Sequence, residues 1–345
     1  MSNKTVYIVG AGASCEVNMP IGETLKKQIS DLLVMNFSRS SFSGGNQELF
    51  YALQGLSENS IEDLQAYCKE CRYISDNMHL AISIDNFIDS NRGNDKLALC
   101  GKIGIVEAIL KAESKSTIYY DSRVGNSEMN YSKLDGTWYL HLFRTITENC
   151  ALEDLEERFS NISMIVFNYD RCIEHVLLNT LAKYFRIPIS EAVKLVQMIE
   201  IIHPYGTVGE LPEFANGKPS IEYGGEFGHR RYVETAKNIY TFTEGGDSED
   251  IKKLRNIMKS SDRLVFLGFA FHRLNMSLLM DSGEKPYPSL KSRKCIGTAY
   301  GSSDQDQELI AASVRALFKN GVDTYIENNT CEKLFMSNTR SLGYD

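Results

Sequence analysis

Short apolar runs alternate with amphipathic stretches at both ends of the chain. Apolar runs at 4–9 and 163–167, and further runs near 199–203, 263–267, 294–299 and 322–326, predict β-strands. Helices are predicted at 21–35 and 171–185. In the first helix Pro20 stands at about the first helical position, and the apolar spacing gives one buried face, made of Leu25, Ile29, Leu32 and Leu33. This alternation predicts an α/β fold with a doubly wound, Rossmann-like parallel sheet and right-handed crossovers.

The middle of the chain carries a different pattern. From about residue 40 the strand signals vanish, and Ser-Gly-Gly-Asn at 43–46 predicts a linker. Helical periodicity then recurs in four stretches, 59–75, 83–90, 95–113 and 135–150, with a polar loop predicted at 114–134. We therefore expect the Rossmann-like domain to comprise 1–36 and 151–330, a helical insertion or lid to comprise 37–150, and a C-terminal tail to comprise 331–345.

Net charge and hydropathy bear on where the protein is located and on what it can contact. The chain has 345 residues and a formal net charge of −8, and a negative surface repels nucleic acid and anionic membranes. No apolar segment approaches the length of about 18 residues that a membrane span requires. The first residues lead directly into a strand rather than into a basic stretch followed by an apolar run. We expect a cytoplasmic protein that contacts neither nucleic acid nor membrane directly.

The eight cysteines are scattered, which favours free and mostly buried thiols over a disulfide framework. One CxxC pair, Cys68-Lys-Glu-Cys71, lies in a predicted helix, and no second pair or paired histidines complete four ligands. We interpret the pair as a buried helical face and expect no zinc. Cys172 has His175 nearby in sequence, but no orienting group is evident, so structural packing is favoured over a nucleophilic role.

The N-terminal apolar strand runs directly into glycines. Residues 6–14 read Val-Tyr-Ile-Val-Gly-Ala-Gly-Ala-Ser, which puts Gly10 and Gly12 where a dinucleotide-binding turn has them. Such a turn brings the backbone close to a pyrophosphate and aims the first amides of a helix at its charge. The spacing is GxGxS, however, with Cys15 in place of a third glycine. Taken alone, the motif leaves nucleotide binding and an ordinary strand-to-helix turn equally open.

Polar residues or glycines follow four later strands. Asn168 and Asp170 come directly after an apolar strand and are expected to project into the crevice at its carboxyl end, although helix capping is favoured for either residue in isolation. His203 closes the next strand, before a Pro and Gly turn that exposes its ring. Gly268 closes another strand, where a ligand could approach the backbone closely. Tyr300 follows the strand after that.

Taken in this order, the motifs resemble those of sirtuin-like domains, and more closely the sirtuin-like NAD hydrolases that serve as effectors in bacterial antiphage defence. The resemblance rests on Gly10-Ala-Gly-Ala-Ser14 with Pro20, on Phe167-Asn-Tyr-Asp170, and on His203 and Gly268 at strand ends. The short motif Ser83-Ile-Asp-Asn-Phe87 also looks like one found in these effectors. The resemblance implies that the Rossmann-like domain binds NAD.

The resemblance further implies a role for each matching residue. One group would line the pyrophosphate and ribose of NAD: Gly10, Ala11, Gly12 and Ser14, with Pro20 beside them. Gly268 and Tyr300 would lie by the adenosine half. Three residues would carry the chemistry: Asn168 would position water and the nicotinamide ribose, Asp170 would face the nicotinamide carboxamide, and His203 would be the general base.

Departures from the protein deacylases of this family are equally informative. Deacylases continue the glycine motif with Gly-Ile-Pro-Asp-Phe-Arg, whereas this chain has Asn-Met-Pro-Ile-Gly-Glu at 18–23. Phe167 stands where a glutamine precedes the family's asparagine, and Pro204 replaces the glycine after the histidine. The two zinc-binding CxxC pairs of deacylases have no counterpart between His203 and the later strands. The geometry needed for an acyl-peptide is therefore in doubt.

The residue types suit cleavage of the bond between nicotinamide and ribose, because the transition state develops positive charge on the sugar. We expect an NAD glycohydrolase that takes NAD as its substrate, releases nicotinamide and ADP-ribose or its cyclic form, and acts in abortive infection. Such an activity requires restraint, so we also expect a homo-oligomer or a partner such as a HerA-type ATPase or another infection sensor. A non-catalytic sensor of NAD or ADP-ribose stays open, with a deacylase as a weaker alternative.

Overall fold

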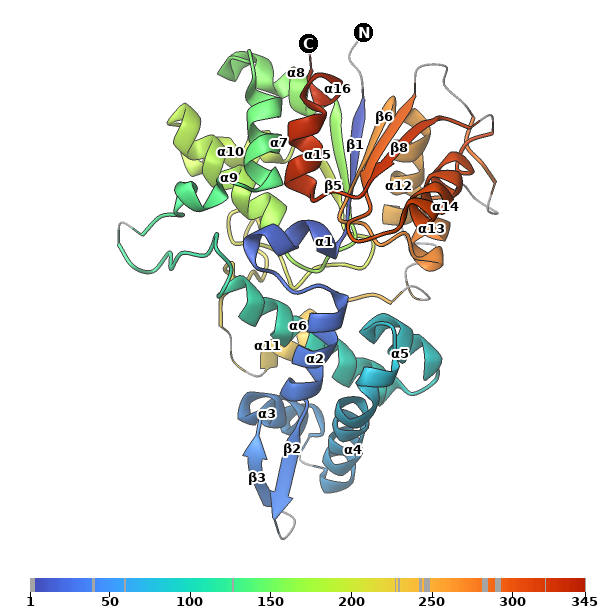
Figure 1. The fold of residues 1–345 in the computed structure, drawn as a ribbon. Coiled ribbons are helices and arrows are strands. Elements are labelled where there is room, and N and C mark those ends of the chain that lie inside the picture. The colour runs from blue at the N-terminus through green and yellow to red at the C-terminus, as the bar shows by residue number, and fades with distance from the viewer. Residues whose placement is uncertain are drawn as a thin grey trace.

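The computed structural model describes residues 4–344 except 39–40, 59, 126, 227, 229, 242–243, 245–248, 281–284, 289–292 and 320. In Figure 1 a sheet with helices on both sides forms the upper half of the molecule, and a mainly helical body lies below it. Both ends of the chain lie at the top of that view, far from the helical body. The helical body is therefore built from chain that leaves the sheet layer and returns to it.

Six parallel strands form the main sheet, in the order β5-β4-β1-β6-β7-β8. Their bounds are β1 Thr5–Val9, β4 Ile162–Val166, β5 Glu200–Ile202, β6 Arg263–Leu267, β7 Lys294–Thr298 and β8 Asp323–Glu327. The predicted strands and the predicted α/β, Rossmann-like fold class are thus confirmed. The chain runs outward from β1 to β5 and then returns to β6 on the other side of β1, which is the strand order of dinucleotide-binding sheets.

After Thr5, the central strand β1 is a buried, mainly apolar run, because helices cover both faces of a parallel sheet. Its side chains from Val6 to Val9 are at most 2% exposed. On one side of the sheet in Figure 1 lie α7 (Trp138–Thr147), α8 (Leu155–Phe159), α9 (Cys172–Phe185) and α10 (Ile189–Val196). On the other lie α12 (Glu249–Ser260), α13 (Arg273–Leu278) and α14 (Asp304–Arg315). The last two helices, α15 (Cys331–Ser337) and α16 (Thr339–Leu342), follow β8, and α15 packs on α7.

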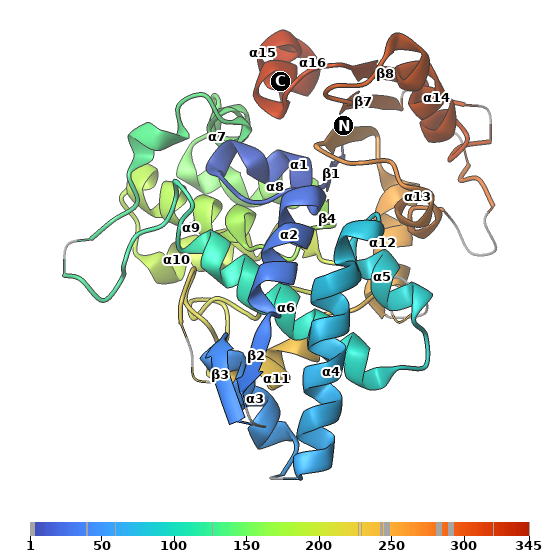
Figure 2. The same cartoon turned by 60° about the horizontal axis from the view of Figure 1, so that its bottom comes forward.

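The helical body contains α2 (Gly22–Leu32), α3 (Gln47–Leu56), α4 (Ile61–Asn77), α5 (Ile84–Ser90) and α6 (Asp95–Glu113). Figure 2 shows α2 and α4 beside α6, and the contacts between these helices agree. A later segment, α11 (Arg230–Ala236), returns to pack on α6 and α3. The helical predictions at 21–35, 59–75, 83–90 and 95–113 are confirmed, although α2 begins at Gly22, so Pro20 lies before the cap residue Ile21 and not in the first turn.

Two predictions for the start of this body are wrong. Strand character does not vanish near residue 40, because β2 (Met35–Ser38) and β3 (Ser41–Gly45) form an antiparallel hairpin. The segment 43–46, expected to be a linker, supplies the end of β3 and the cap of α3. Phe42 stacks on Phe50 at a centroid distance of 4.5 Å, and this contact holds the hairpin against α3. Small residues in β3 mask its strand pattern in the sequence.

The expected division into 1–36 with 151–330, 37–150 and 331–345 stays a prediction. The contacts place α2 with the helices that follow it, and they place α7 beside the sheet, against α9 and α15. The segment 114–134 ends in a short 3-10 helix, η3 (Tyr131–Leu134). Its tyrosines contact α9: the hydroxyls of Tyr120 and Tyr131 donate hydrogen bonds to the side chain and the backbone of Asn179.

Two polar contacts join the helical body to the sheet layer. Glu113, at the end of α6, is fully buried and accepts hydrogen bonds from the backbone amide and the guanidinium of Arg171, at 3.2 and 3.1 Å. The Tyr169 hydroxyl donates a hydrogen bond to the carboxylate of Asp85, which belongs to the 83–87 motif of α5. Removing one partner of a buried ion pair typically costs about 3–5 kcal/mol, so the Arg171–Glu113 pair strongly constrains how the two halves meet.

The state of the cysteines agrees with the prediction of free, mostly buried thiols. All eight cysteines are free, and six of them are buried. Cys68 and Cys71 lie on the buried face of α4, as predicted. Cys172 is buried against Tyr223, as a packing role predicts, and burial raises the pKa of its thiol well above the ordinary range. Among the described residues, no helix is long and apolar enough to cross a membrane.

Glycine is required where the turn after β1 meets the turn after β6. A Cβ atom on Gly10 or Gly12 would lie 2.6 or 2.8 Å from the carbonyl oxygen of Gly268, and one on Gly268 would lie 2.0 Å from the amide nitrogen of Ala13. Gly268 also has a φ of +54°, which side chains disfavour. The Gly12 amide donates a 3.0 Å hydrogen bond to the Gly268 carbonyl. The two turns therefore pack backbone against backbone.

This close approach predicts that Gly268→Ala destabilises the protein by about 2–5 kcal/mol, from the left-handed backbone and the steric overlap together. The measurement is urea unfolding followed by circular dichroism. Gly55→Ala is the matched control, because a Cβ there meets nothing within 4 Å and the position is exposed in α3. The control should be neutral or more stable by up to about 1 kcal/mol. Equal stabilities for the two variants would contradict the packing described here.

Candidate functional site

A cavity of about 670 Å³ opens at the carboxyl ends of β1, β6 and β7. Four residues predicted to bind NAD line it: Ala11, Gly12, Gly268 and Tyr300. Three others, Gly10, Ser14 and Pro20, do not line it. The cavity adjoins β1, where the strand order reverses, which is where ligands bind in open α/β sheets.

The turn that borders this cavity differs from the expected phosphate cradle. The helix that directly follows Gly10 is α1 (Ala11–Ser14), a single turn continued by the 3-10 helix η1 (Cys15–Val17), while the longer α2 lies in the helical body. The Gly10 amide donates to the Leu267 carbonyl at 2.9 Å, and the Gly12 amide is also engaged by backbone. Both glycines therefore serve the close packing of the turn, and the helix that starts there is only one turn long.

Asn168 follows β4 and is the centre of the polar contacts at this edge. Its side-chain amide donates hydrogen bonds to the Gly10 carbonyl, at 3.2 Å, and to the Ser14 hydroxyl, at 3.0 Å. The residue is 4% exposed, and its side-chain oxygen Oδ1 is buried with no hydrogen-bond partner among the described residues. Burying a carbonyl oxygen without a hydrogen-bond partner costs free energy. This favours a ligand or water that donates a hydrogen bond to Oδ1.

Ser14 and Asp170 complete the surroundings of Asn168. The Ser14 hydroxyl also lies 3.3 Å from the hydroxyl of Tyr139, a buried residue of α7. Asp170 precedes the N-cap residue Arg171 and accepts a 3.1 Å hydrogen bond from the Cys172 amide, so it satisfies the first amide of α9 without being the N-cap itself. Burial raises the pKa of Asp170, and the hydrogen bonds from Cys172 and Ser14 oppose that rise.

His203 directly follows β5. Its side chain is 10% exposed, so the expectation of an exposed ring is wrong, because Asn168 and Glu174 engage both ring nitrogens. Nδ1 lies 3.1 Å from the Asn168 carbonyl oxygen, and Nε2 lies 2.8 Å from Oε1 of Glu174 on α9. Burial alone would lower the pKa of His203, but the Glu174 carboxylate and the Asn168 carbonyl outweigh it and raise the pKa above the ordinary value. Conversely, burial would raise the pKa of Glu174, and the facing imidazolium lowers it. The contact therefore favours the charged form of both groups.

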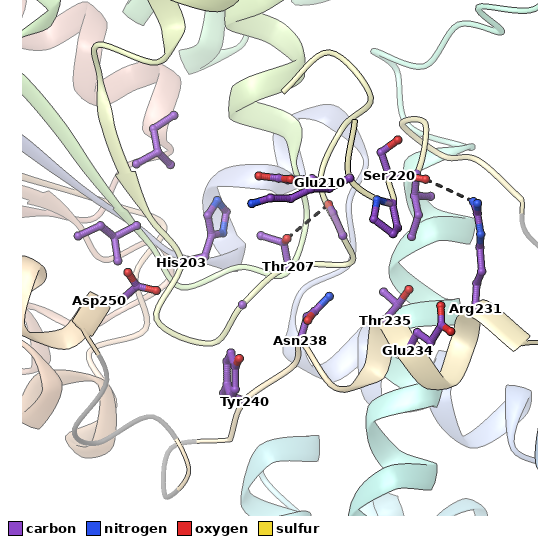
Figure 3. A pocket seen from close by; sticks show the side chains of 17 residues that line it. His203, Thr207, Glu210, Ser220, Arg231, Glu234, Thr235, Asn238, Tyr240 and Asp250 are labelled. Carbon is purple, nitrogen blue, oxygen red and sulfur yellow. Dashed lines mark hydrogen bonds between the residues drawn. The ribbon is translucent and has the colours of Figure 1, made fainter. Parts of the chain in front are cut away.

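Two further cavities, of about 560 and 350 Å³, meet at His203 and share Thr207 and Glu210. Figure 3 shows the larger one, with His203 and Asp250 toward the sheet and residues of α11 at the far side. The glycine-lined cavity at β1 includes neither Asn168 nor His203. A series of aromatic contacts, Phe269 to Phe167 at 5.0 Å and Phe167 to Tyr205 at 5.7 Å, runs from that cavity toward the turn after His203.

The structure therefore brings Gly10, Ser14, Asn168, Asp170 and His203 together, and it places Gly268 and Tyr300 at the neighbouring cavity. Sequence reasoning missed four residues of the site: Glu174, Tyr139, Thr298, which accepts from the Gly268 amide, and Asp85 as the partner of Tyr169. Glu174 lies in the first turn of α9, four residues after Asp170, and this closeness in sequence is the signal that could have found it. Among the described residues, no group of three or more His, Cys, Asp or Glu side chains could hold a metal ion.

No protein-family model and no curated protein sequence matches this chain. Among solved structures, the chain is similar to one described as "Structure of Sir2Tm bound to a propionylated peptide". The two share 11% sequence identity and superpose with a TM-score of 0.39, over 100% of this chain and 95% of that chain.

Proposed function

We propose that this protein is an NAD glycohydrolase, which cleaves the bond between nicotinamide and ribose. The observation that carries the proposal is Asn168 Oδ1, which is buried between the glycine turn and His203 and has no hydrogen-bond partner within the described part of the chain. A water or a ribose hydroxyl is the kind of group that would donate to this oxygen. The motif pattern of the sequence supplies the choice of NAD, because its residues coincide with those gathered at the site.

The proposed binding mode spans the switch point of the sheet. The cavity at Ala11, Gly12 and Gly268 has the size of a small-molecule site, with apolar walls from residues such as Phe269 and Ile310. We assign it to the adenosine half of NAD, with Tyr300 at its rim. The nicotinamide ribose would then extend past the glycine turn toward Asn168. Because Phe167 and Phe269 are in contact on that route, binding would require these rings to move.

The proposed reaction breaks the glycosidic C–N bond, and nicotinamide leaves as a neutral molecule with the bonding electrons. Positive charge develops on the ribose, and the Asn168 side-chain oxygen and the Asp170 carboxylate would stabilise it. A water attacks the anomeric carbon and gives its proton to His203, which yields ADP-ribose. Attack by a hydroxyl or an adenine nitrogen of the same molecule would instead give a cyclic product. General base catalysis of this kind contributes about 10²–10⁴-fold.

We also infer that the resting conformation is a restrained one. A general base must be neutral, whereas the Glu174 carboxylate, 2.8 Å from Nε2, favours the charged form of His203. Restraint suits an enzyme that depletes cellular NAD in antiphage defence, because unregulated activity would kill its own cell. Self-assembly, or a partner such as a HerA-type ATPase or another infection sensor, would then release the restraint. A specific activity that rises with protein concentration would indicate self-assembly.

A non-catalytic sensor of NAD or ADP-ribose is the second candidate. The observation in its favour is that both nitrogens of His203 are engaged, which a binding module tolerates. A deacylase is a weaker candidate, because the departures at 18–23 and at Phe167 remove residues that acyl-peptide chemistry uses. Binding and turnover measured separately distinguish these functions.

Replacing Asn168 tests the hydrolase. We expect Asn168→Ala to reduce nicotinamide release by about 10²–10³-fold, because it removes the oxygen that faces the developing charge. NAD binding, measured by calorimetry, should persist, since the adenosine cavity is untouched. Asn168→Asp keeps the shape and tests whether lost packing explains the result. Asn36→Ala in the exposed β2 is the matched control and should keep full activity. A wild-type protein that binds NAD and never releases nicotinamide would favour the sensor.

Replacing Tyr300 tests the binding mode. Tyr300 is 78% exposed at the rim of the cavity, so its loss costs little stability. We expect Tyr300→Ala to weaken NAD binding by about two- to tenfold, which corresponds to about 0.5–1.5 kcal/mol of aromatic contact. Tyr325→Ala is the control, because Tyr325 is 58% exposed on β8 and does not line the cavity. Equal affinities for the two variants would place the adenosine half elsewhere.

A further inference from the structure

Glu174 is a charged side chain beside the candidate base, and it takes part in none of the bond changes of the proposed reaction. It lies in the first turn of α9, and its side chain is 18% exposed. One carboxylate oxygen contacts His203 Nε2 at 2.8 Å, and the other, Oε2, is buried with no hydrogen-bond partner among the described residues. The helix therefore holds a carboxylate directly against the candidate base.

We propose that Glu174 is a positioning residue that orients the His203 ring and sets the pH at which that ring loses its proton. The effect of Glu174 on hydrolysis rests on the proposed function. Its effect on the orientation and protonation of the His203 ring does not. In this arrangement Glu174 and His203 act as one unit, and the neutral imidazole forms only when that unit loses a proton.

The hydrogen-bond geometry leads to this assignment. Both groups that face the His203 ring, the Asn168 carbonyl oxygen and the Glu174 carboxylate, are acceptors. A neutral imidazole carries one N–H and can satisfy only one of them, whereas an imidazolium donates to both. The contact with Asn168 also holds the ring next to the residue that carries the unpartnered amide oxygen. Orientation and charge of His203 therefore both depend on Glu174.

The remaining charged groups around His203 leave Glu174 as its direct partner. Asp170, in the turn after β4, also raises the pKa of His203, but its carboxylate is bonded to the Cys172 amide. Arg171 is directed away, into its pair with Glu113. Glu210 and Asp250 line the cavities beside His203, from the loop after β5 and from α12. Neither of these two carboxylates forms a hydrogen bond with the ring among the described contacts.

The sign of the pH effect follows from this pairing. The raised pKa of His203 means that the charged ring, and the stability it contributes, is present at low pH and lost as pH rises through that value. The lowered pKa of Glu174 means that its contribution is lost only as pH falls through an acidic value. Hydrolysis that needs neutral His203 should therefore rise with pH above the ordinary range of histidine.

The direct test follows the His203 ring by NMR titration of the full chain, with its signal assigned by its loss in His203→Gln. We expect a wild-type midpoint above 6.5, the ordinary value for histidine, and a lower midpoint in Glu174→Gln, which keeps the shape and removes the charge. Glu174→Asp keeps a carboxylate and should partly restore the wild-type midpoint. Glu191→Gln, an exposed glutamate on α10, is the control and should leave it unchanged. An unchanged midpoint in Glu174→Gln would overturn the proposal.

Measuring nicotinamide release as a function of pH distinguishes the role of Glu174 from the proposed hydrolase function. At one pH unit below the wild-type half-maximum, wild-type nicotinamide release should fall to about a tenth of its plateau, as expected for a single protonation. Glu174→Gln should lose less of its own plateau at that pH, with NAD affinity unchanged. If the NMR midpoints shift as expected and no variant releases nicotinamide, the role of Glu174 stands and the hydrolase is contradicted. Hydrolysis with a pH profile that Glu174→Gln does not move would contradict the role of Glu174 alone.

Discussion

The structure of the site depends on the backbone contact between the turn after β1 and the turn after β6. Gly10, Gly12 and Gly268 meet there so closely that no Cβ atom fits between them, and a hydrogen bond from the Gly12 amide joins the two turns. This contact forms one wall of the cavity at the switch point. It also places Ser14, one helical turn later, where its hydroxyl and the Gly10 carbonyl orient the Asn168 side chain. The hydrogen bonds from Asn168 to Gly10 and Ser14 thus link the position of the Asn168 side chain to the geometry of the sheet.

From Asn168 the polar contacts continue to His203 and then to Glu174 on α9. The start of α9 is tied in turn to the helical body, because Arg171 pairs with the buried Glu113 at the end of α6. A movement of the helical body relative to the sheet would therefore act on the same short segment that carries Asn168, Asp170 and Glu174. We infer that a regulatory signal could reach the site by this route, which gives the predicted restraint a physical path.

Much of this fold could be predicted from the sequence, because buried parallel strands are continuous apolar runs and their carboxyl ends are marked by glycine or polar residues. That is why Asn168, Asp170 and His203 could be singled out in advance. The hairpin β2–β3 escaped prediction because Gly44, Gly45 and the serines of β3 carry no apolar alternation. The Glu174–His203 pair could not be predicted, because a helical pattern does not tell which residue of another element faces Glu174. That residue, His203, follows β5 and lies 29 positions later in the chain.

NAD hydrolysis is tested most directly by chromatography of NAD incubated with the purified protein, over a range of protein concentration and from neutral to mildly alkaline pH. We expect release of nicotinamide with an equal amount of ADP-ribose or its cyclic form, increasing with pH as His203 loses its proton. NAD that binds to the protein and stays intact across the whole range would contradict hydrolysis and identify the site as one that recognises NAD without cleaving it.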